Sequence, residues 1–297
     1  MRSSTLNASD LRQLAERWLA DGKTAMVVHV ADIQGSTPRS TDARMLVALD
    51  QVLGTIGGGH LEWQAVAVAR QALQEYAVHA VPSGTALPTW RQRFALGPTL
   101  GQCCGGAVVL EFAPLSAPLL QAWPPTKPRF HLDLHGAGHV GQAIVQLLAG
   151  IDCQVRWIDQ RLDEPDPVGL PDPQWQAALP PHIQPMSTDD AVAEVAHAPW
   201  ASLHLVLTHR HDLDLSIVDA LMRRDDIRQG QGWIGLIGSR SKRAAFEHRL
   251  LARGHDQHLI DHMACPIGLP GIEGKSPPVI AIAVVAQLLQ LTNSDLP

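Results

Sequence analysis

Residues 135–141 read His-Gly-Ala-Gly-His-Val-Gly, and this stretch decides the fold of the second half of the chain. Its glycines, Gly136, Gly138 and Gly141, match the G-x-G-x-x-G pattern. An apolar run at 130–134 predicts a strand before the glycines, and the residues up to 148 predict a helix after them. A second predicted strand at 154–158 ends at Asp159. This order of strand, glycine turn, helix, strand and acidic residue indicates a Rossmann-like domain with a parallel sheet.

The same pattern raises the question of a nucleotide ligand. An acidic residue at the position of Asp159 binds an unphosphorylated ribose, which favours NAD over NADP. The glycines can instead serve packing alone, in a Rossmann domain kept as a scaffold. The residues leave these two interpretations equally open. No clear catalytic acid–base set accompanies the motif, which argues against an enzyme that uses it.

The α/β pattern continues beyond Asp159. Residues 161–185 contain seven prolines and no clear period, which predicts an extended excursion without an assignable role. Strands follow at 202–207 and 233–237, and helices at 241–253 and 278–290. The strand ends should share an edge with the glycine turn, which brings four histidines near one another: His135, His139, His209 and His211. No carboxylate or cysteine completes a known metal spacing there, so we favour an edge without metal.

Two adjacent cysteines stand out in the first half of the chain. They lie in the segment Gly101-Gln102-Cys103-Cys104-Gly105-Gly106. Glycines on both sides predict an exposed, flexible turn that presents the thiols to a group that binds sulfur or is bound by it. Neighbouring cysteines are poorly placed to bond to each other, which argues against a structural disulfide. The alternative is a tight turn with two buried cysteines, and the residues alone leave the two equally open.

A second turn, at residues 35–39, carries Ser36, Thr37 and Arg39. Two hydroxyls and a guanidinium in one turn are suited to a phosphate. The alternative is an ordinary connection between strands.

A third turn contains three consecutive glycines, Gly57, Gly58 and Gly59, and leads directly into a helix that extends to residue 73. Backbone amides at such a helix start form an anion site that suits a phosphate, a pterin or a carboxylate. His60 and Glu62 then either contact the ligand or only open the helix, where a glutamate favours the helix dipole.

The length of 297 residues predicts about two domains, and the 45% hydrophobic content is sufficient for sizeable cores. Residues 1–113 predict an α/β domain that carries the three glycine-rich loops. Residues 114–128 contain five prolines and predict a semi-rigid linker. Residues 129–297 form the Rossmann-like domain and end in a helix.

Composition excludes several classes of protein. The net charge is −6 and no dense lysine or arginine run occurs, which argues against nucleic-acid binding. Four cysteines in a chain of this length do not make a disulfide scaffold and favour a reducing compartment. Residues 1–10 lack the apolar core of a signal peptide, and the apolar run at 279–291 is too short to span a membrane. We therefore expect a soluble, cytoplasmic protein.

Four stretches become informative together: residues 54–62, 96–106, 234–243 and 265–269. They resemble those of the XdhC/CoxF family of xanthine dehydrogenase accessory proteins, in the family's order along nearly the whole chain. The Gln-Cys-Cys-Gly-Gly at 102–106 and the histidine after the triple glycine resemble the XdhC branch in particular.

The resemblance implies a maturation factor for xanthine dehydrogenase, an enzyme of purine catabolism. Such a factor binds the molybdenum cofactor in its molybdopterin form and protects it while a cysteine desulfurase supplies the terminal sulfur. It then delivers the cofactor to apo xanthine dehydrogenase. We expect a non-catalytic chaperone that forms a homodimer. The competing hypothesis is an NAD-dependent oxidoreductase that acts through the Rossmann-like domain.

The residues expected to serve these roles fall into two sets. Cys103 and Cys104 carry soft thiolates, which are suited to bind the metal of the cofactor or to handle its sulfur. This role is implied by the resemblance. The expected cofactor site further includes Arg39, Gly57, Gly58, Gly59, His60, Glu62, Gln102, Gly105 and Gly106. The expected nucleotide site consists of Gly136, Gly138, Gly141 and Asp159.

Overall fold

The computed structural model describes residues 8–34, 43–78, 87–96, 106–123, 127–164 and 169–293. The chain divides into two units, Met1–Lys127 and Pro128–Pro297. Each unit contains one five-stranded sheet with helices packed on it. The sequence prediction of a mixed α/β protein with a C-terminal Rossmann-like domain is confirmed.

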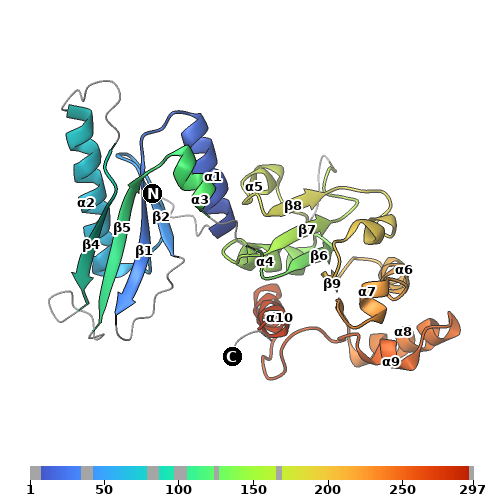
Figure 1. Cartoon of the computed structure of the whole chain (residues 1–297). Coiled ribbons are helices and arrows are strands. Elements are labelled where there is room, and N and C mark those ends of the chain that lie inside the picture. Colours follow the sequence, from blue (N-terminus) through green and yellow to red (C-terminus); the bar gives the residue numbers. More distant parts are fainter. Residues whose placement is uncertain are drawn as a thin grey trace. The chain divides into compact units, whose positions relative to one another are not determined.

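The sheet of the first unit is antiparallel, with the strand order β3-β2-β1-β5-β4. Figure 1 shows β2, β1, β5 and β4 of this sheet side by side. Its strands are β1 (Met26–Gln34), β2 (Arg44–Val47), β3 (Val52–Gly54), β4 (Trp90–Ala95) and β5 (Ala107–Pro114). Side chains alternate between its faces, so that Val28 and Val27 enter different cores. Helix α2 (Gly59–Val78) covers one face, and α1 (Ala8–Ala20) with α3 (Ala117–Ala122) covers the other.

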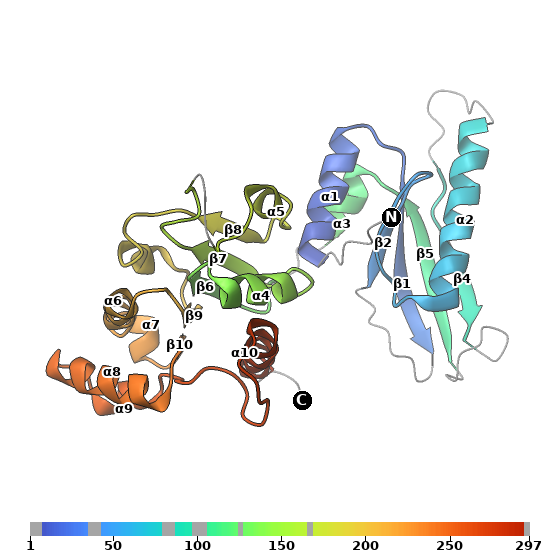
Figure 2. The same cartoon turned by 180° about the vertical axis from the view of Figure 1, so that it is seen from behind.

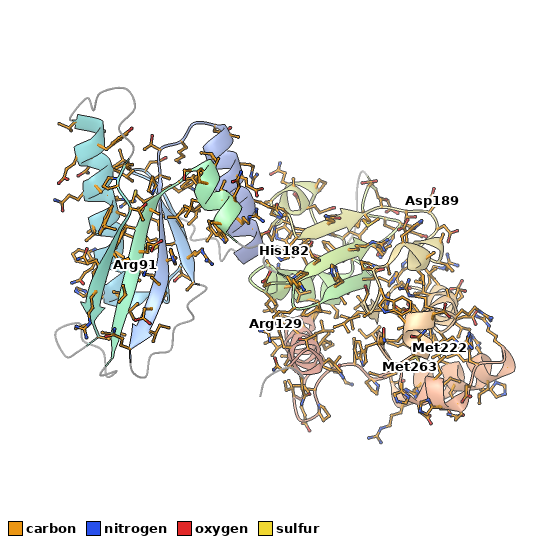
Figure 3. All side chains as sticks on the ribbon, viewed as in Figure 1. Arg91, Arg129, His182, Asp189, Met222 and Met263 are labelled. Atoms are coloured by element: carbon orange, nitrogen blue, oxygen red, sulfur yellow. The ribbon has the colours of Figure 1, made fainter. Side chains whose placement is uncertain are left out.

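Helix α2 fits its face because small and apolar residues recur every four positions. Leu61, Ala65, Ala69 and Leu73 are buried, and the two alanines let the helix approach the strands closely. On the outer part of the sheet, Arg91 of β4 binds Glu111 of β5 with 2.7 Å between Nε and Oε2 (Figure 3).

The segment 114–128, for which the sequence predicts a linker, contains a helix in its described part. Pro114 ends β5, and α3 follows, with Ser116 Oγ accepting from the amide of Leu119 at 3.4 Å. Leu120 and Trp123 are buried in the core beneath α1. The proline content predicted a linker without a helix. One of these prolines lies in the first turn of α3, where proline is compatible with a helix.

The sheet of the second unit is parallel, with the strand order β10-β9-β6-β7-β8 (Figure 2). Its strands are β6 (His131–His135), β7 (Gln154–Ile158), β8 (Ile183–Met186), β9 (Leu203–Val206) and β10 (Trp233–Leu236). Helices α4 (His139–Leu148) and α10 (Pro277–Leu291) pack side by side on one face. Helices α6 (His211–Leu221) and α8 (Arg240–Ala252) cover the other. The described part of this unit also contains four short helices: α5 (Pro173–Ala177), η2 (Ala193–His197), α7 (Asp225–Arg228) and α9 (Gln257–Asp261).

The connections create a switch point in this sheet. The chain runs from β6 through β7 to β8 on one side, then crosses to β9 and β10 on the other. Beta strands β6 and β9 are therefore neighbours whose connections leave in opposite directions, and ligands of such sheets bind in the crevice at this point. Within residues 161–185, for which the sequence predicts an extended excursion, α5 forms and β8 begins; β8 tolerates Pro185 because it is an edge strand. Among the described helices, none has the length and apolar character needed to cross a membrane.

Candidate functional site

The turn after β6 is held by close backbone packing. Gly136 has a φ of +125°, and a Cβ there would lie 2.4 Å from the carbonyl oxygen of Leu207. A Cβ on Gly141 would lie 2.2 Å from the oxygen of Gly136. The Gly136 amide donates to Ile158 O at 2.8 Å, and the Trp157 indole donates to Gly136 O at 3.0 Å. The fold itself therefore requires the first and third glycines of the motif.

The second glycine is different. Gly138 has a φ of −68°, which any residue can adopt, and no atom lies within 4 Å of its hypothetical Cβ. It is the N-cap of α4, and no side chain caps the helix there. The packing does not require a glycine, but a ligand that approaches the start of α4 does, because a Cβ would occupy that space. This is the feature of the turn that fits a bound pyrophosphate.

Asp159 lies at the end of β7, as expected, but its carboxylate is fully engaged. It accepts from the Ala137 amide at 2.8 Å and from the amide, Nε and Nη2 of Arg161 at 3.0, 2.9 and 2.8 Å. Burial alone would raise the pKa of Asp159, but the hydrogen bonds from Arg161 and Ala137 outweigh burial and lower it. These four bonds use the lone-pair positions of the carboxylate. A ribose hydroxyl can bind Asp159 only if Arg161 withdraws, which weakens the basis for preferring NAD.

Two residues that the sequence did not single out fix the neighbouring loops. Asp214 of α6 accepts from the amide and hydroxyl of Thr208 at 3.0 and 2.7 Å. Lys242 of α8 donates to Asp214 at 2.6 Å and to the carbonyl of Ile237 at 2.9 Å. This buried ion pair ties the loop after β9 to the loop after β10. An aspartate between two leucines was the one signal available in the sequence, which did not predict α6.

The four histidines expected at this edge differ in their exposure. His135 is fully buried in the sheet, whereas His139, His209 and His211 are exposed. His135 lies instead beside two residues that the sequence analysis did not name, Asp133 and His204.

In the first unit, strand register brings the ends of two predicted loops together. Gln34 at the end of β1 is paired with Ala107 at the start of β5, which is paired with Ala95 at the end of β4. The Leu96 amide donates to Gly106 O at 2.7 Å, and Arg93 Nε donates to Gln34 Oε1 at 3.3 Å. The start of α2 lies toward this same end of the sheet (Figure 1).

Five predicted site residues fall in the segments that begin and end at these positions. Arg39, Gln102, Cys103, Cys104 and Gly105 lie outside the described residues. The structure does describe the residues that flank these segments. Segment 35–42 follows β1 and segment 97–105 precedes β5, and these two adjacent strands meet the segments at the same end of the sheet.

Glu62 holds the triple-glycine turn in place. One carboxylate oxygen, Oε2, accepts from Thr55 Oγ1 at 2.5 Å, from the Ile56 amide at 3.0 Å and from the Gly58 amide at 3.1 Å. The loop thus binds an anion, but the anion is its own glutamate. The sequence analysis expected Glu62 either to contact a ligand or only to open the helix. In the structure its carboxylate instead bonds to the glycine turn that precedes it.

The turn also presents an exposed aromatic surface. Gly57, Gly58 and Gly59 have φ values of +108°, +70° and +73°, a run of left-handed residues that only glycines adopt easily. The next residue, His60, stacks on Trp63 with ring centroids 5.5 Å apart, and Trp63 is 67% exposed. A flat, exposed pair of rings therefore stands beside the start of α2.

Comparison with known proteins places these features in a family context. Residues 132–288 match a family model described as the XdhC Rossmann domain, and residues 18–80 match one described as the XdhC and CoxI family. Neither match includes the cysteine segment at 101–106. Uncharacterized protein YqeB of Escherichia coli (strain K12) is 30% identical over 276 residues, which cover 90% of this chain and 43% of that protein. The chain thus spans less than half of the length of this curated relative.

A solved structure shares the fold. A crystal structure described as a xanthine dehydrogenase from Bacillus halodurans aligns with a TM-score of 0.67 at 19% identity, over 97% of both chains. At this level of identity the likeness establishes the fold of the chain.

The contrast between Gly138 and Gly141 gives a test of nucleotide binding. We expect Gly138→Ala to cost less than about 1 kcal/mol of stability, since its Cβ meets no atom. Gly141→Ala should cost about 1–3 kcal/mol, since its Cβ would overlap the oxygen of Gly136. If NAD binds at α4, calorimetry should lose the NAD heat in Gly138→Ala although the protein stays folded. An unmodified protein that gives no heat with NAD would identify the turn as a scaffold.

The role of Glu62 gives a second test. Glu62→Ala removes three hydrogen bonds to a carboxylate and should destabilise the first unit by about 1–3 kcal/mol. The amides of Ile56 and Gly58 should exchange their hydrogens faster, and urea unfolding should report the loss of stability. Glu62→Gln keeps one acceptor oxygen and should lose less. Equal stability of Glu62→Ala and the parent would show that the carboxylate does not hold the turn.

Proposed function

The chain belongs to the XdhC family, and from this premise we propose that it is a maturation factor that carries the molybdenum cofactor to apo xanthine dehydrogenase. The cofactor is the cargo of such a protein, bound and later released, and a cysteine desulfurase is the partner that supplies its terminal sulfur. The observation that carries the proposal is the gathering, at one end of the first unit, of the attachment points of the cysteine segment and of the segment with Arg39.

The chemistry of these segments suits a molybdenum pterin. A thiolate of Cys103 or Cys104 is a soft ligand that can bind the metal or accept sulfur. Arg39, with the hydroxyls of Ser36 and Thr37, suits the phosphate of the pterin side chain. Both segments attach to adjacent strands, so a single ligand at this end can meet both groups.

The start of α2 supports the same proposal in a modified way. Glu62 occupies the amides of Ile56 and Gly58, so we assign it to holding the turn rather than to binding the cargo. The exposed His60–Trp63 pair offers a surface on which the flat pterin ring can stack. In this proposal the glycine turn positions the aromatic pair, and the cysteine segment supplies the bond to the metal.

The second unit suggests an alternative function. The open space at Gly138 favours a bound dinucleotide, and an NAD-dependent oxidoreductase is the corresponding alternative. It is the less well supported of the two, because Asp159 is engaged by Arg161 and because the nearby Lys242–Asp214 pair is buried and bonded within the fold.

The cysteines provide the decisive experiment. The protein should be purified from cells that make the molybdenum cofactor but lack the apo dehydrogenase, and its pterin and molybdenum contents measured together. We expect both at a common stoichiometry. Cys103→Ala or Cys104→Ala, and the double variant, should reduce cargo retention by roughly tenfold or more, because alanine offers no ligand to the metal. Stability should change by less than about 0.5 kcal/mol, as for a surface substitution.

Cys265→Ala is the matched control. Burial raises the pKa of this thiol, more than nearby Arg243 and Lys242 lower it, so it is a poor source of thiolate. Its loss should leave pterin and molybdenum contents unchanged. Absence of both from the parent, or full loading and delivery by the double variant, would refute the role of the cysteine pair.

A further inference from the structure

Three buried side chains on the sheet of the second unit have the donor atoms of a metal site. Asp133 and His135 are two residues apart on β6, so both project from the same face. His204 on β9 is paired with Asp133 in the parallel register. One ligand atom from each of the three residues lies within 4.8 Å of the other two. The intervening Leu134 belongs to the core beneath α4 and α10, which places the three polar side chains on the other face.

The two histidines are buried without the partners that imidazoles need. His135 and His204 are both 0% exposed, and neither ring nitrogen of either residue has a hydrogen-bond partner among the described residues. The distance from His204 Nδ1 to Asp133 Oδ2, 3.9 Å, is too long for a hydrogen bond. A neutral imidazole carries one donor and one acceptor, and leaving both unsatisfied in a protein interior is costly. Something other than the described side chains must satisfy these nitrogens.

The rings are in the form that binds metal. Both imidazoles are 0% exposed, and burial in a protein interior disfavours the charged form of an imidazole. Metal ions bind the lone pair of a neutral imidazole, and no proton has to be displaced from either ring.

The charged side chains around the three residues carry an excess of negative charge. Arg156 binds Asp133 at 3.3 Å and also binds Glu194, while Arg224 binds Asp226 at 2.7 Å. Two arginines thus face three carboxylates, and one negative charge is left over. Asp133 is only 1% exposed, and keeping an excess charge in the interior is costly. A bound cation offsets this excess charge directly.

We propose that Asp133, His135 and His204 bind one divalent transition-metal ion of the zinc type. Two imidazole nitrogens and a carboxylate oxygen are a ligand set that such ions accept, with the fourth position of the tetrahedron left for water. The ion links β6 to β9, the two strands that flank the switch point, and one of its ligands directly precedes Gly136. The proposal is independent of the cargo carried by the first unit.

The test uses the full chain produced in zinc-supplemented medium and then passed through a desalting column. Elemental analysis should find one zinc per chain, and His204→Gln and Asp133→Asn should each lose it. Cobalt-substituted parent should show visible d–d absorption bands that are absent from both variants. Zinc should raise the melting temperature of the chelator-treated parent by roughly 5 °C at saturation, and that of His204→Gln by nothing.

Two control variants separate the proposed ion from other histidines. His258 and His262 are one turn apart on and just after α9, with ring centroids at 4.4 Å, and form a competing surface pair. His262→Gln should keep the zinc. His182 is equally buried in the same unit but already bonds the carbonyl of Leu148 at 3.1 Å (Figure 3). His182→Gln should therefore keep the zinc as well.

Several outcomes would overturn the proposal. A parent without zinc and without cobalt bands would show that buried water molecules satisfy the rings. Zinc retained by both His204→Gln and Asp133→Asn, or zinc lost from His262→Gln, would place the ion elsewhere. Should His204→Gln fail to fold, Asp133→Asn and the cobalt spectrum of the parent still decide the matter.

Discussion

The backbone contact between Gly136 and Gly141 is the constraint on which the second unit depends. With no side chain on either residue, the oxygen of Gly136 can lie against the first turn of α4, and the turn can pass directly over Leu207. That approach fixes the direction in which α4 leaves β6, and therefore which face of the sheet it shares with α10. It also leaves the start of α4 open at Gly138, where no atom lies within 4 Å of a Cβ built on that residue.

Charged side chains near this turn form hydrogen bonds that hold neighbouring loops in place, so their polar atoms are already occupied. Asp159 secures Ala137 and Arg161, and the Asp214–Lys242 pair secures the loops after β9 and β10. Glu62 does the same for the glycine turn of the first unit. Buried charges of this kind are retained where their hydrogen bonds are complete. His135 and His204 are the exception on this sheet, and an incomplete set of partners is the reason to look for a missing ion.

Local patterns predicted the elements better than the roles of individual residues. The glycine fingerprint and the apolar runs on either side predicted β6, α4 and β7 within a residue or two. Proline-rich stretches were harder, because a proline reads as a break yet lies in the first turn of α3 and in the edge strand β8. Roles such as that of Glu62 depended on which amides the carboxylate reached after folding, and residue spacing does not contain that information.

Residue patterns were sufficient to predict the family, the parallel sheet with its glycine turn, and the presence of a thiol segment and a triple-glycine turn in the first unit. These follow from short-range rules, since periodicity, glycine placement and residue chemistry act over a few neighbouring positions. The folded structure was needed to show that Arg161 engages Asp159, that His135 is buried whereas the other three histidines are exposed, and that His135 lies beside Asp133 and His204. Such groupings arise because parallel pairing places residues about 70 positions apart on adjacent strands, and strand order is set by the packing of the whole sheet.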